Sequence, residues 1–394
     1  MLLWVLVIYT TIPFVRELRE WYVARWDPVW IGLAVAIVLL AAGTSTLALA
    51  RRRTREMTSR DTVWILGATA VLVVWTVSLR RSPEESVHLV EYGVLAILLH
   101  RALRPSMQDA LVFVAGALIG AMVGTVDEII QWLSPSRYWD WRDLALNGGA
   151  GALTQVILWR MSAAATRRFD PASMRIVLRL ASAHLVLLTL CLANTPARVA
   201  RYAPWLPNSG HLTSSLNPMA EYGRRHIVPG IGIFNSRLSL EALRREDDTR
   251  SVEVAGLVDE NRHSYGHFLD TWPVDRDPFT YEARVHLFAR DRNLAKARAK
   301  KFRGATALEQ LTVAWHENRL METFFGRTLE ESSYRWKPAL RQQVDDAHDA
   351  DSRFRSAAGS HLITIASEGT IRTVLILLVA GLIIAGRRLG QSTG

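Results

Sequence analysis

Apolar residues along the chain are gathered in eight segments that are nearly or wholly free of charged side chains. They are residues 1–15, 30–50, 62–79, 86–103, 110–133, 144–159, 176–193 and 371–386. A helix of about 20 apolar residues crosses the roughly 30 Å hydrocarbon core of a bilayer, and most of these segments are long enough. The pattern predicts an all-α, polytopic transmembrane helix bundle with about eight spans. It excludes a soluble cytoplasmic enzyme.

The stretch between the last two apolar segments, residues 194–370, has the composition of an ordinary soluble domain. It is long enough for one domain with its own hydrophobic core. We therefore divide the chain into five parts: two N-terminal spans in 1–61, a transmembrane core in 62–161, a seventh span in 162–193, the soluble domain in 194–370, and the last span with a short tail in 371–394.

Arginine residues in the short loops predict how the spans are oriented, because cytoplasmic loops carry the excess of positive charge. If the N-terminus is cytoplasmic, the loops on that side hold most of the arginines, including the run at 51–53. This layout places both termini in the cytoplasm and residues 194–370 outside the cell. The net charge of +10 also lies mainly outside 194–370. We therefore expect no nucleic-acid partner, because a nucleic-acid-binding domain concentrates its basic residues on one soluble face.

Proline positions and helical spacing predict the structure of residues 194–370. Prolines recur between 196 and 229 and exclude a continuous helix there. Beyond them, apolar residues at helical spacing predict helices over 239–260, 281–303, 306–325 and 338–358, with Ser239 as the N-cap of the first. Because alternating β-branched residues are scarce, we expect a mostly helical extracytoplasmic domain inserted before the last span.

Three pairs of side chains in this domain have spacings that metal sites use: His263 with His267, Glu282 with His286, and His316 with Glu317. A metal site would require these pairs to converge in space, and we expect them instead to be solvated or hydrogen-bonded surface residues. The chain has no glycine-rich phosphate loop, no G-x-S-x-G motif and no nucleophilic cysteine with a histidine partner. Nucleotide binding and thiol catalysis are therefore disfavoured. The sequence identifies no cofactor or metal, and it leaves open whether the protein is an enzyme.

Polar side chains interrupt the apolar segments at the ends that the predicted layout places on the outer side. His88, Glu91 and Tyr92 open the fourth segment and share one helix face, at spacings of three and four. The others belong to the end of the fifth segment, the following loop and the start of the sixth: Asp127, Glu128, Gln131, Arg137, Arg142, Asp143 and Asn147. Carboxylates inside a membrane cost about 2.5–3.5 kcal/mol each on insertion scales, so we expect them to pair or to serve a function.

Glycines spaced by four predict that the fifth and sixth segments approach closely. Gly116, Gly120 and Gly124 form a stripe that Glu128 continues, and further glycines occupy positions 148, 149 and 151. Stripes of small residues let membrane helices pack backbone against backbone, which would bring the polar residues of both segments together. The alternative is that these residues lie hydrated in the headgroup region, pair with the loop arginines and fix the loop.

The residue types in this polar group suit acid–base chemistry on a charged substrate. The candidates for catalysis can exchange a proton or hold a divalent ion or a hydroxyl group; they are His88, Glu91, Asp127, Glu128 and Asp143. The candidates for substrate binding are Tyr92, Gln131, Arg137, Arg142 and Asn147. Among them, His88 and Glu91 would form the acid–base pair, and the two arginines would bind a phosphate.

These residues occur in an order that resembles the VanZ-like family of bacterial membrane proteins. The resemblance covers about residues 62–161, and the matching positions are His88, Tyr92, Asp127, Glu128, Gln131, Arg137, Asp143, Asn147 and Gly151. The chain departs from the family pattern in reading Pro135-Ser136-Arg137, where a glycine often precedes the arginine, and in placing Gly151 one position off. The resemblance implies a protein of the bacterial cell envelope in the inner membrane, and a link to low-level resistance against the glycopeptide teicoplanin.

Two functions from different classes remain open. In the first, an outward-facing polar site binds or modifies a membrane lipid, its headgroup or a lipid-linked envelope precursor. In the second, the protein is a non-enzymatic scaffold, in which the polar group locks the helices and residues 194–370 recruit an envelope protein partner. A small transporter is disfavoured, because the sequence shows no interrupted helix near the middle of the membrane and no repeated half.

Overall fold

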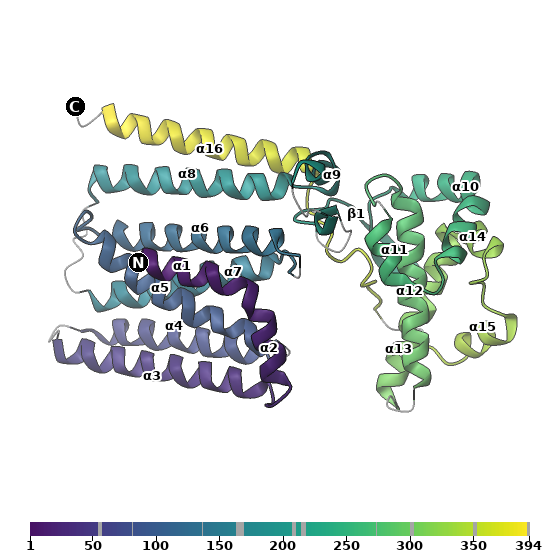
Figure 1. Cartoon of the computed structure of the whole chain (residues 1–394), viewed down its shortest axis with the longest axis horizontal. Coiled ribbons are helices and arrows are strands. Elements are labelled where there is room, and N and C mark those ends of the chain that lie inside the picture. Colours follow the sequence, from purple (N-terminus) through teal and green to yellow (C-terminus); the bar gives the residue numbers. More distant parts are fainter. Residues whose placement is uncertain are drawn as a thin grey trace. The chain divides into compact units, whose positions relative to one another are not determined.

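The computed structural model describes residues 1–53, 57–80, 82–135, 137–162, 169–206, 210–213, 218–272, 274–299, 303–349 and 353–391. Within these ranges the chain forms sixteen α-helices, a few short 3-10 turns and one two-stranded antiparallel hairpin (Figure 1). The expectation of a predominantly helical protein is therefore correct. The chain divides into two compact units, Met1–Cys191 together with Arg372–Gly394, and Leu192–Ile371.

The first unit, which we call the membrane unit, consists of long apolar helices. Its elements are α1 (Leu2–Thr11), η1 (Ile12–Phe14), α2 (Val15–Val23), α3 (Val29–Arg53), α4 (Ser59–Ser78), η2 (Pro83–Ser86), α5 (Val87–Leu103), α6 (Leu111–Leu133), α7 (Trp141–Met161), α8 (Pro171–Ala193) and α16 (Glu368–Gln391). Among the described residues, six segments are long and apolar enough to cross a membrane: Val29–Arg52, Ser59–Ser78, Pro83–Leu103, Leu111–Leu133, Pro171–Ala193 and Glu368–Gln391. The protein therefore has the composition of an integral membrane protein.

Two of the eight predicted spans differ from these six. Helix α1 has 10 residues and is about 15 Å long, half the thickness of the hydrocarbon core. Helix α7 is long enough, but it is less apolar than the others. It nevertheless packs against α4, α5 and α6 (Figure 1). Two of its polar residues, Asn147 and Gln155, are accordingly buried.

Close packing of α6 on α7 depends on glycine. A Cβ atom on Gly124 would lie 2.8 Å from Cβ of Asn147 and 3.3 Å from a ring carbon of Tyr92. A Cβ atom on Gly116 would likewise clash with the side chain of Gln155, and one on Gly149 would clash with the ring of Trp75. Because a Cβ atom tolerates no contact as close as 2.8 Å, these helices can approach only where the side chain is missing. The sequence stripe at 116, 120 and 124 therefore marks a real helix contact.

The second unit, which we call the soluble unit, follows α8. Its elements are α9 (Pro196–Tyr202), η3 (Ala203–Trp205), η4 (Gly210–Thr213), β1 (Arg224–Val228), β2 (Gly232–Ser236), α10 (Leu240–Glu260), α11 (Tyr265–Thr271), α12 (Pro278–Arg298), α13 (Ala305–Phe324), α14 (Gly326–Glu331) and α15 (Pro338–Asp345). Strands β1 and β2 pair from Arg224 opposite Ser236 to Val228 opposite Gly232. Strand β1 lies within the region that the prolines excluded from helix formation and β2 follows that region; neither strand was predicted.

Three of the four helices predicted for the soluble unit match the structure, whereas α9, α11 and α14 were not predicted. The side chain of Ser239 caps α10 by accepting a hydrogen bond from the amide of Ala242, and α12 and α13 begin within three residues of the predicted positions. The helix predicted over 338–358 is wrong in length, because α15 ends at Asp345. Residues 300–302 and 350–352 of the predicted helices lie outside the described residues.

A buried cluster of charges holds the hairpin of the soluble unit against α12. The Arg237 guanidinium lies 2.7 Å from a carboxylate oxygen of Glu221 and 3.2 Å from one of Glu282. Both carboxylates are about 5% exposed. Ser236 donates a hydrogen bond to the second oxygen of Glu282, and His361 bonds Glu221 at 2.8 Å. The arginine therefore compensates two carboxylates that could not be buried without a positive partner.

Replacing Arg237 should destabilise the protein strongly. We expect Arg237→Ala to cost about 3–5 kcal/mol of unfolding free energy, because it leaves two buried carboxylates without a counter-charge. The matched control is Arg327→Ala, whose ion pair with Asp248 is about 60% exposed on both sides and should be worth less than about 1 kcal/mol. The measurement is denaturant unfolding of the purified full chain in detergent, followed by tryptophan fluorescence. Equal losses for the two variants would contradict this assignment.

Acidification should weaken the same cluster. Burial alone would raise the pKa of Glu221, but the His361 hydrogen bond and the Arg237 charge outweigh burial and hold this pKa below its usual range. The stabilisation is therefore complete above the unfolded-state pKa of about 4.3, and it is lost as the pH falls through the lower folded-state pKa. We expect the melting temperature of the full chain to fall below about pH 4, and Glu221→Gln to show a smaller fall from its own neutral-pH value. An equal acid-induced fall in the variant would show that Glu221 is not responsible.

Candidate functional site

The polar side chains of the membrane unit come together where three helix ends meet. The start of α5 supplies His88 and Tyr92, the end of α6 supplies Asp127 and Glu128, and the start of α7 supplies Asn147. The intervening segment, which leads into α7, ends with Asp140 as the N-cap, whose carboxylate accepts a hydrogen bond from the amide of Arg142 at 2.7 Å. Ser136 of this segment lies outside the described residues. We call this group the polar cluster.

A hydrogen bond between α5 and α6 forms the centre of the polar cluster. The hydroxyl of Tyr92 donates to a carboxylate oxygen of Asp127 at 3.0 Å, and each residue is only 1% exposed. His88 lies one turn before Tyr92, with the two ring centroids 6.3 Å apart. The sequence spacing of four therefore places an imidazole and a phenol on the face of α5 that meets Asp127.

A glutamine connects the loop arginine to a second carboxylate. Gln131 donates its amide hydrogen to Glu128 at 2.9 Å, and its amide oxygen accepts hydrogen bonds from Nε of Arg137 at 3.0 Å and from Nη2 of the same side chain. The other carboxylate oxygen of Glu128 accepts a bond from the backbone amide of Asp140 at 3.3 Å. Glu128 is fully buried. The positive charge of Arg137 is thus held close to a buried carboxylate without bonding to it directly.

Two residues of α7 bring polar atoms into the cluster that the chain does not satisfy. Asn147 is fully buried, and neither its amide nitrogen nor its amide oxygen has a hydrogen-bond partner in the described part of the chain. One carboxylate oxygen of Asp143, one turn earlier on α7, is likewise buried without a hydrogen-bond partner in the described part of the chain. Buried polar groups are nearly always hydrogen-bonded in proteins, so unsatisfied ones call for an explanation.

His88 and Glu91 form the pair that the sequence suggested as acid and base. The imidazole Nδ1 lies 3.3 Å from a carboxylate oxygen of Glu91, and the side chains are 18% and 28% exposed. This pair is therefore the most accessible part of the cluster around α5. The Nδ1 atom itself is buried and makes no hydrogen bond among the described residues, so the contact with Glu91 is one of charge alone.

Arg142 does not join the buried carboxylates. Its side chain is 66% exposed, and its guanidinium lies 2.8 Å from a carboxylate oxygen of Glu85. Glu85 belongs to η2, the turn before α5, and was not among the predicted site residues. In this structure the two arginines thus have separate partners, Gln131 for Arg137 and Glu85 for Arg142, and their joint action on one group stays a prediction. The partners differ because Arg142 lies on the outer face of the first turn of α7, whereas Asn147 lies on the inner face.

The N-terminal helix contributes to the cluster in a way that the sequence did not reveal. The indole of Trp4 donates to the backbone oxygen of Glu91 at 3.1 Å, and the Tyr9 hydroxyl donates to the backbone oxygen of Val123 at 3.2 Å. Helix α1 therefore ties α5 to α6 beside the Tyr92–Asp127 bond. The only sequence signal was the presence of two aromatic residues with polar atoms in an otherwise apolar segment.

No group of three or more histidine, cysteine or acidic residues is placed to hold a metal ion within the described ranges. We therefore assign no metal to Asp127, Glu128 and Asp143. The arrangement offers a proton-exchanging pair at the edge, two buried carboxylates, an arginine bound to neutral atoms, and unsatisfied amide atoms. Such a set can hold a polar or phosphate-bearing group by hydrogen bonds and charge.

The candidate metal pairs of the soluble unit are structural, but two of the three are not surface residues as expected. His286 Nδ1 lies 2.8 Å from Glu317, and both are at most 2% exposed. Glu282 is engaged with Arg237, as described above, and His316 is buried as well. The surface prediction failed because α12 and α13 pack face to face across these positions. It holds for His263 and His267, which are exposed.

Comparisons with models of protein families, with curated proteins and with solved structures found no match to this chain, so the evidence for its function is the site itself.

Proposed function

We propose that this chain is a VanZ-like integral membrane protein of the bacterial cell envelope, whose polar cluster binds or modifies a lipid-linked or headgroup substrate from the outer side. The observation that supports this most is Asn147. Its amide is fully buried beside Gly124 and Tyr92, yet both of its polar atoms lack a partner in the described chain.

The energetic argument is that such an amide is costly unless something else uses it. An unsatisfied buried polar group costs about 1–3 kcal/mol, and an apolar residue at the same place would avoid that cost. A side chain whose role is only to lock two helices would be expected to form hydrogen bonds, as Tyr92 does with Asp127. Binding sites, by contrast, are commonly built at some cost to stability.

The proposed topology keeps about eight spans and a cytoplasmic location for both termini in the inner membrane. Besides the six long apolar helices it counts α7, which packs among α4, α5 and α6, and the N-terminal apolar segment 1–15, which would cross as α1 together with the turn that follows it. Residues 194–370 then lie outside, and the polar cluster faces the same side. Arginines in loops on the opposite side support this orientation.

The alternative proposal is a scaffold whose outer domain recruits an envelope protein. Two hydrogen bonds favour this alternative. The bond from Tyr92 to Asp127 connects α5 with α6, and Gln131, which donates to Glu128, also binds Arg137 of the following loop. The two proposals differ in what a substitution does to stability and to function, so variants can separate them.

Removing the amide of Asn147 should abolish function without destabilising the protein. We expect Asn147→Ala to melt at or above the wild-type temperature, because no hydrogen bond of the described chain is lost, and to lose the envelope phenotype. The matched control is Gln155→Ala on the same helix, whose amide donates to the backbone oxygen of Ala96 at 2.9 Å; its loss should cost about 0.5–1.5 kcal/mol. The measurements are melting temperature in detergent and teicoplanin sensitivity with lipid composition of an expressing bacterium. A clear destabilisation by Asn147→Ala would favour the scaffold.

Neutralising the charged members should likewise remove function while leaving the protein in the membrane. We expect Glu128→Gln and Arg137→Ala to abolish the same phenotype at near-normal membrane abundance, since Glu128→Gln keeps one acceptor oxygen without a buried charge, and Arg137 bonds only a neutral amide oxygen among the contacts described above. The control is Glu85→Gln, whose carboxylate pairs with the exposed Arg142, and it should keep the phenotype. Quantitative immunoblotting of membranes gives the abundance. Variants that disappear from the membrane would support the scaffold, and variants that stay fully active would refute the site.

A further inference from the structure

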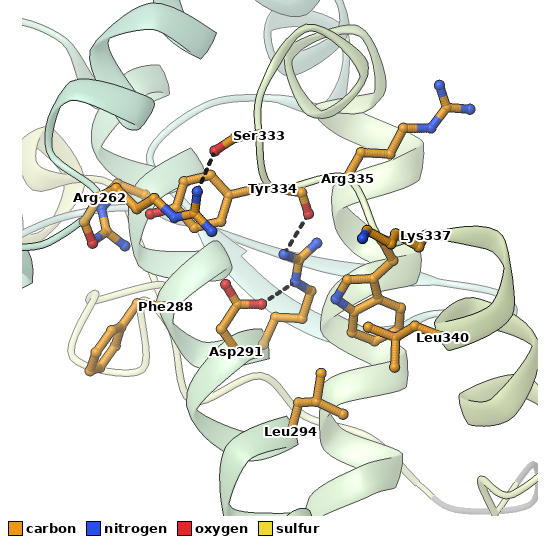
Figure 2. A pocket seen from close by; sticks show the side chains of 12 residues that line it. Arg262, Phe288, Asp291, Leu294, Ser333, Tyr334, Arg335, Lys337 and Leu340 are labelled. Atoms are coloured by element: carbon orange, nitrogen blue, oxygen red, sulfur yellow. Dashed lines mark hydrogen bonds and ion pairs between the residues drawn. The ribbon is translucent and has the colours of Figure 1, made fainter.

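A pocket of about 460 Å³ opens in the soluble unit, far along the chain from the polar cluster (Figure 2). Helix α12 forms one side, and the segment between α14 and α15 forms the other. Arg262, from the turn that follows α10, closes one end. The volume lies within the range of about 300–1,000 Å³ that small-molecule sites occupy in proteins.

The pocket is strongly basic. Its charged lining residues are one acid, Asp291, and five bases: Arg262, Arg284, Arg290, Arg335 and Lys337. The single carboxylate is already bound, because Nε of Arg290 donates to it at 2.8 Å. In Figure 2 the side chain of Arg335 extends away from the other residues, so the inner part of the pocket depends on the remaining bases.

Two of these arginines are buried, which distinguishes the pocket from a solvated basic surface. Arg290 is 1% exposed, and it bonds Asp291, the amide oxygen of Asn318 and the backbone oxygen of Tyr334. Arg284 is 3% exposed, and its Nε has no hydrogen-bond partner among the residues that the structure describes. This nitrogen is itself buried, so the observation shows that the chain does not use all the hydrogen-bonding capacity of the Arg284 guanidinium, whose side chain is part of the pocket lining.

The partners of these arginines differ from those of other arginines in the same unit. Arg250 meets three carboxylates, those of Glu246, Glu253 and Asp277. Arg284, by contrast, donates to the backbone oxygens of Asn261 and Arg262. These neutral partners leave its positive charge uncompensated. An anion would supply the missing compensation.

Aromatic rings form the walls of the pocket. The guanidinium of Arg290 lies over the ring of Trp336 at 5.1 Å from its centroid, and that of Arg262 lies over Tyr334 at 5.6 Å. Phe288 lines the same space and is stacked on Tyr265. Cation–π contacts fix the guanidinium groups in place without using up all of their donors. The flat apolar surfaces between them suit a ring or another apolar group on the ligand.

We propose that this pocket binds an organic phosphate, that is, a phosphate monoester carried by a ring-shaped or apolar group. Without Arg335, four bases face one acid, and this excess of three positive charges favours a dianion over a single carboxylate. Guanidinium groups also match phosphate oxygens in geometry. The aromatic walls would hold the organic part. This inference is independent of the function proposed for the polar cluster, because it uses none of the same residues.

Titration of the purified full chain in detergent tests the ligand class. The probes are phenyl phosphate, inorganic phosphate and benzoate, and the measurement is isothermal calorimetry. We expect saturable binding of phenyl phosphate that weakens with salt, at least tenfold weaker binding of inorganic phosphate, and weaker binding still of benzoate. Absence of phenyl phosphate binding would overturn the proposal. Benzoate binding as tight as that of phenyl phosphate would overturn the assignment to phosphate, and equal binding of inorganic phosphate would overturn the organic part.

Variants at the rim of the pocket locate the binding without disturbing its buried arginines. Arg262 and Lys337 are exposed, so Arg262→Gln and Lys337→Gln should fold normally and weaken phenyl phosphate binding by about tenfold each, the typical effect of losing one charge-assisted bond. The matched control is Arg245→Gln, an exposed arginine on α10 outside the pocket, which should leave the affinity unchanged. If all three variants bind phenyl phosphate as tightly as the wild-type chain, binding occurs elsewhere and the proposal is overturned.

Binding measured in a lipid bilayer distinguishes two sources of the phosphate, a lipid headgroup and a soluble organic phosphate. The full chain is placed in nanodiscs of phosphatidylcholine alone, or of phosphatidylcholine with phosphatidic acid, whose headgroup is a phosphate monoester. If phosphatidic acid competes for the pocket, the affinity of the wild-type chain for phenyl phosphate falls in the second lipid mixture, and that of Lys337→Gln does not. This result would identify a lipid headgroup as the occupant. Unchanged affinity would identify a soluble organic phosphate.

Discussion

The close approach of α6 to α7 is the constraint on which the polar cluster depends. Gly124 allows Asn147 and Tyr92 to lie against the α6 backbone at distances that no side chain would permit. An interface this tight leaves little room for water, so the polar groups within it must find partners in the chain. Tyr92 does so with Asp127, and Gln155 does so with the α5 backbone.

Asn147 and Asp143, which lie side by side on the first turns of α7, keep polar atoms without a hydrogen-bond partner among the described residues, and so does the amide oxygen of Gln155. The rest of the cluster surrounds them with complementary chemistry, since Glu128 and Asp127 are hydrogen-bond acceptors and Arg137 is a donor held nearby through Gln131. The same packing that makes unsatisfied amide atoms expensive also makes them strong recognition groups for a substrate that reaches them. The stability lost to the unsatisfied atoms and their strength in substrate recognition therefore have the same physical origin, the exclusion of water.

The soluble unit buries its polar groups by a different means, direct charge pairing. Arg237 binds Glu221 and Glu282, and His286 binds Glu317, so each buried charge has an opposite or hydrogen-bonded partner. Against this background the pocket beside α12 stands out, because its buried arginines meet mostly neutral atoms. Burial fixes the orientation of these side chains, and that leaves a preorganised positive surface instead of a set of mobile surface arginines.

The sequence by itself determined the helices and the residues that share a face of each one. Apolar segments predicted the long helices of the membrane unit, and the spacing of four placed His88 and Tyr92 on one side of α5, because helix periodicity is a local property. Only the tertiary structure decided which faces meet. It directed Arg142 outward to Glu85, brought α1 against α6 through Tyr9, and buried His286 between α12 and α13. Those outcomes depend on how each helix is rotated against its neighbours, and the packing of the whole unit sets that rotation.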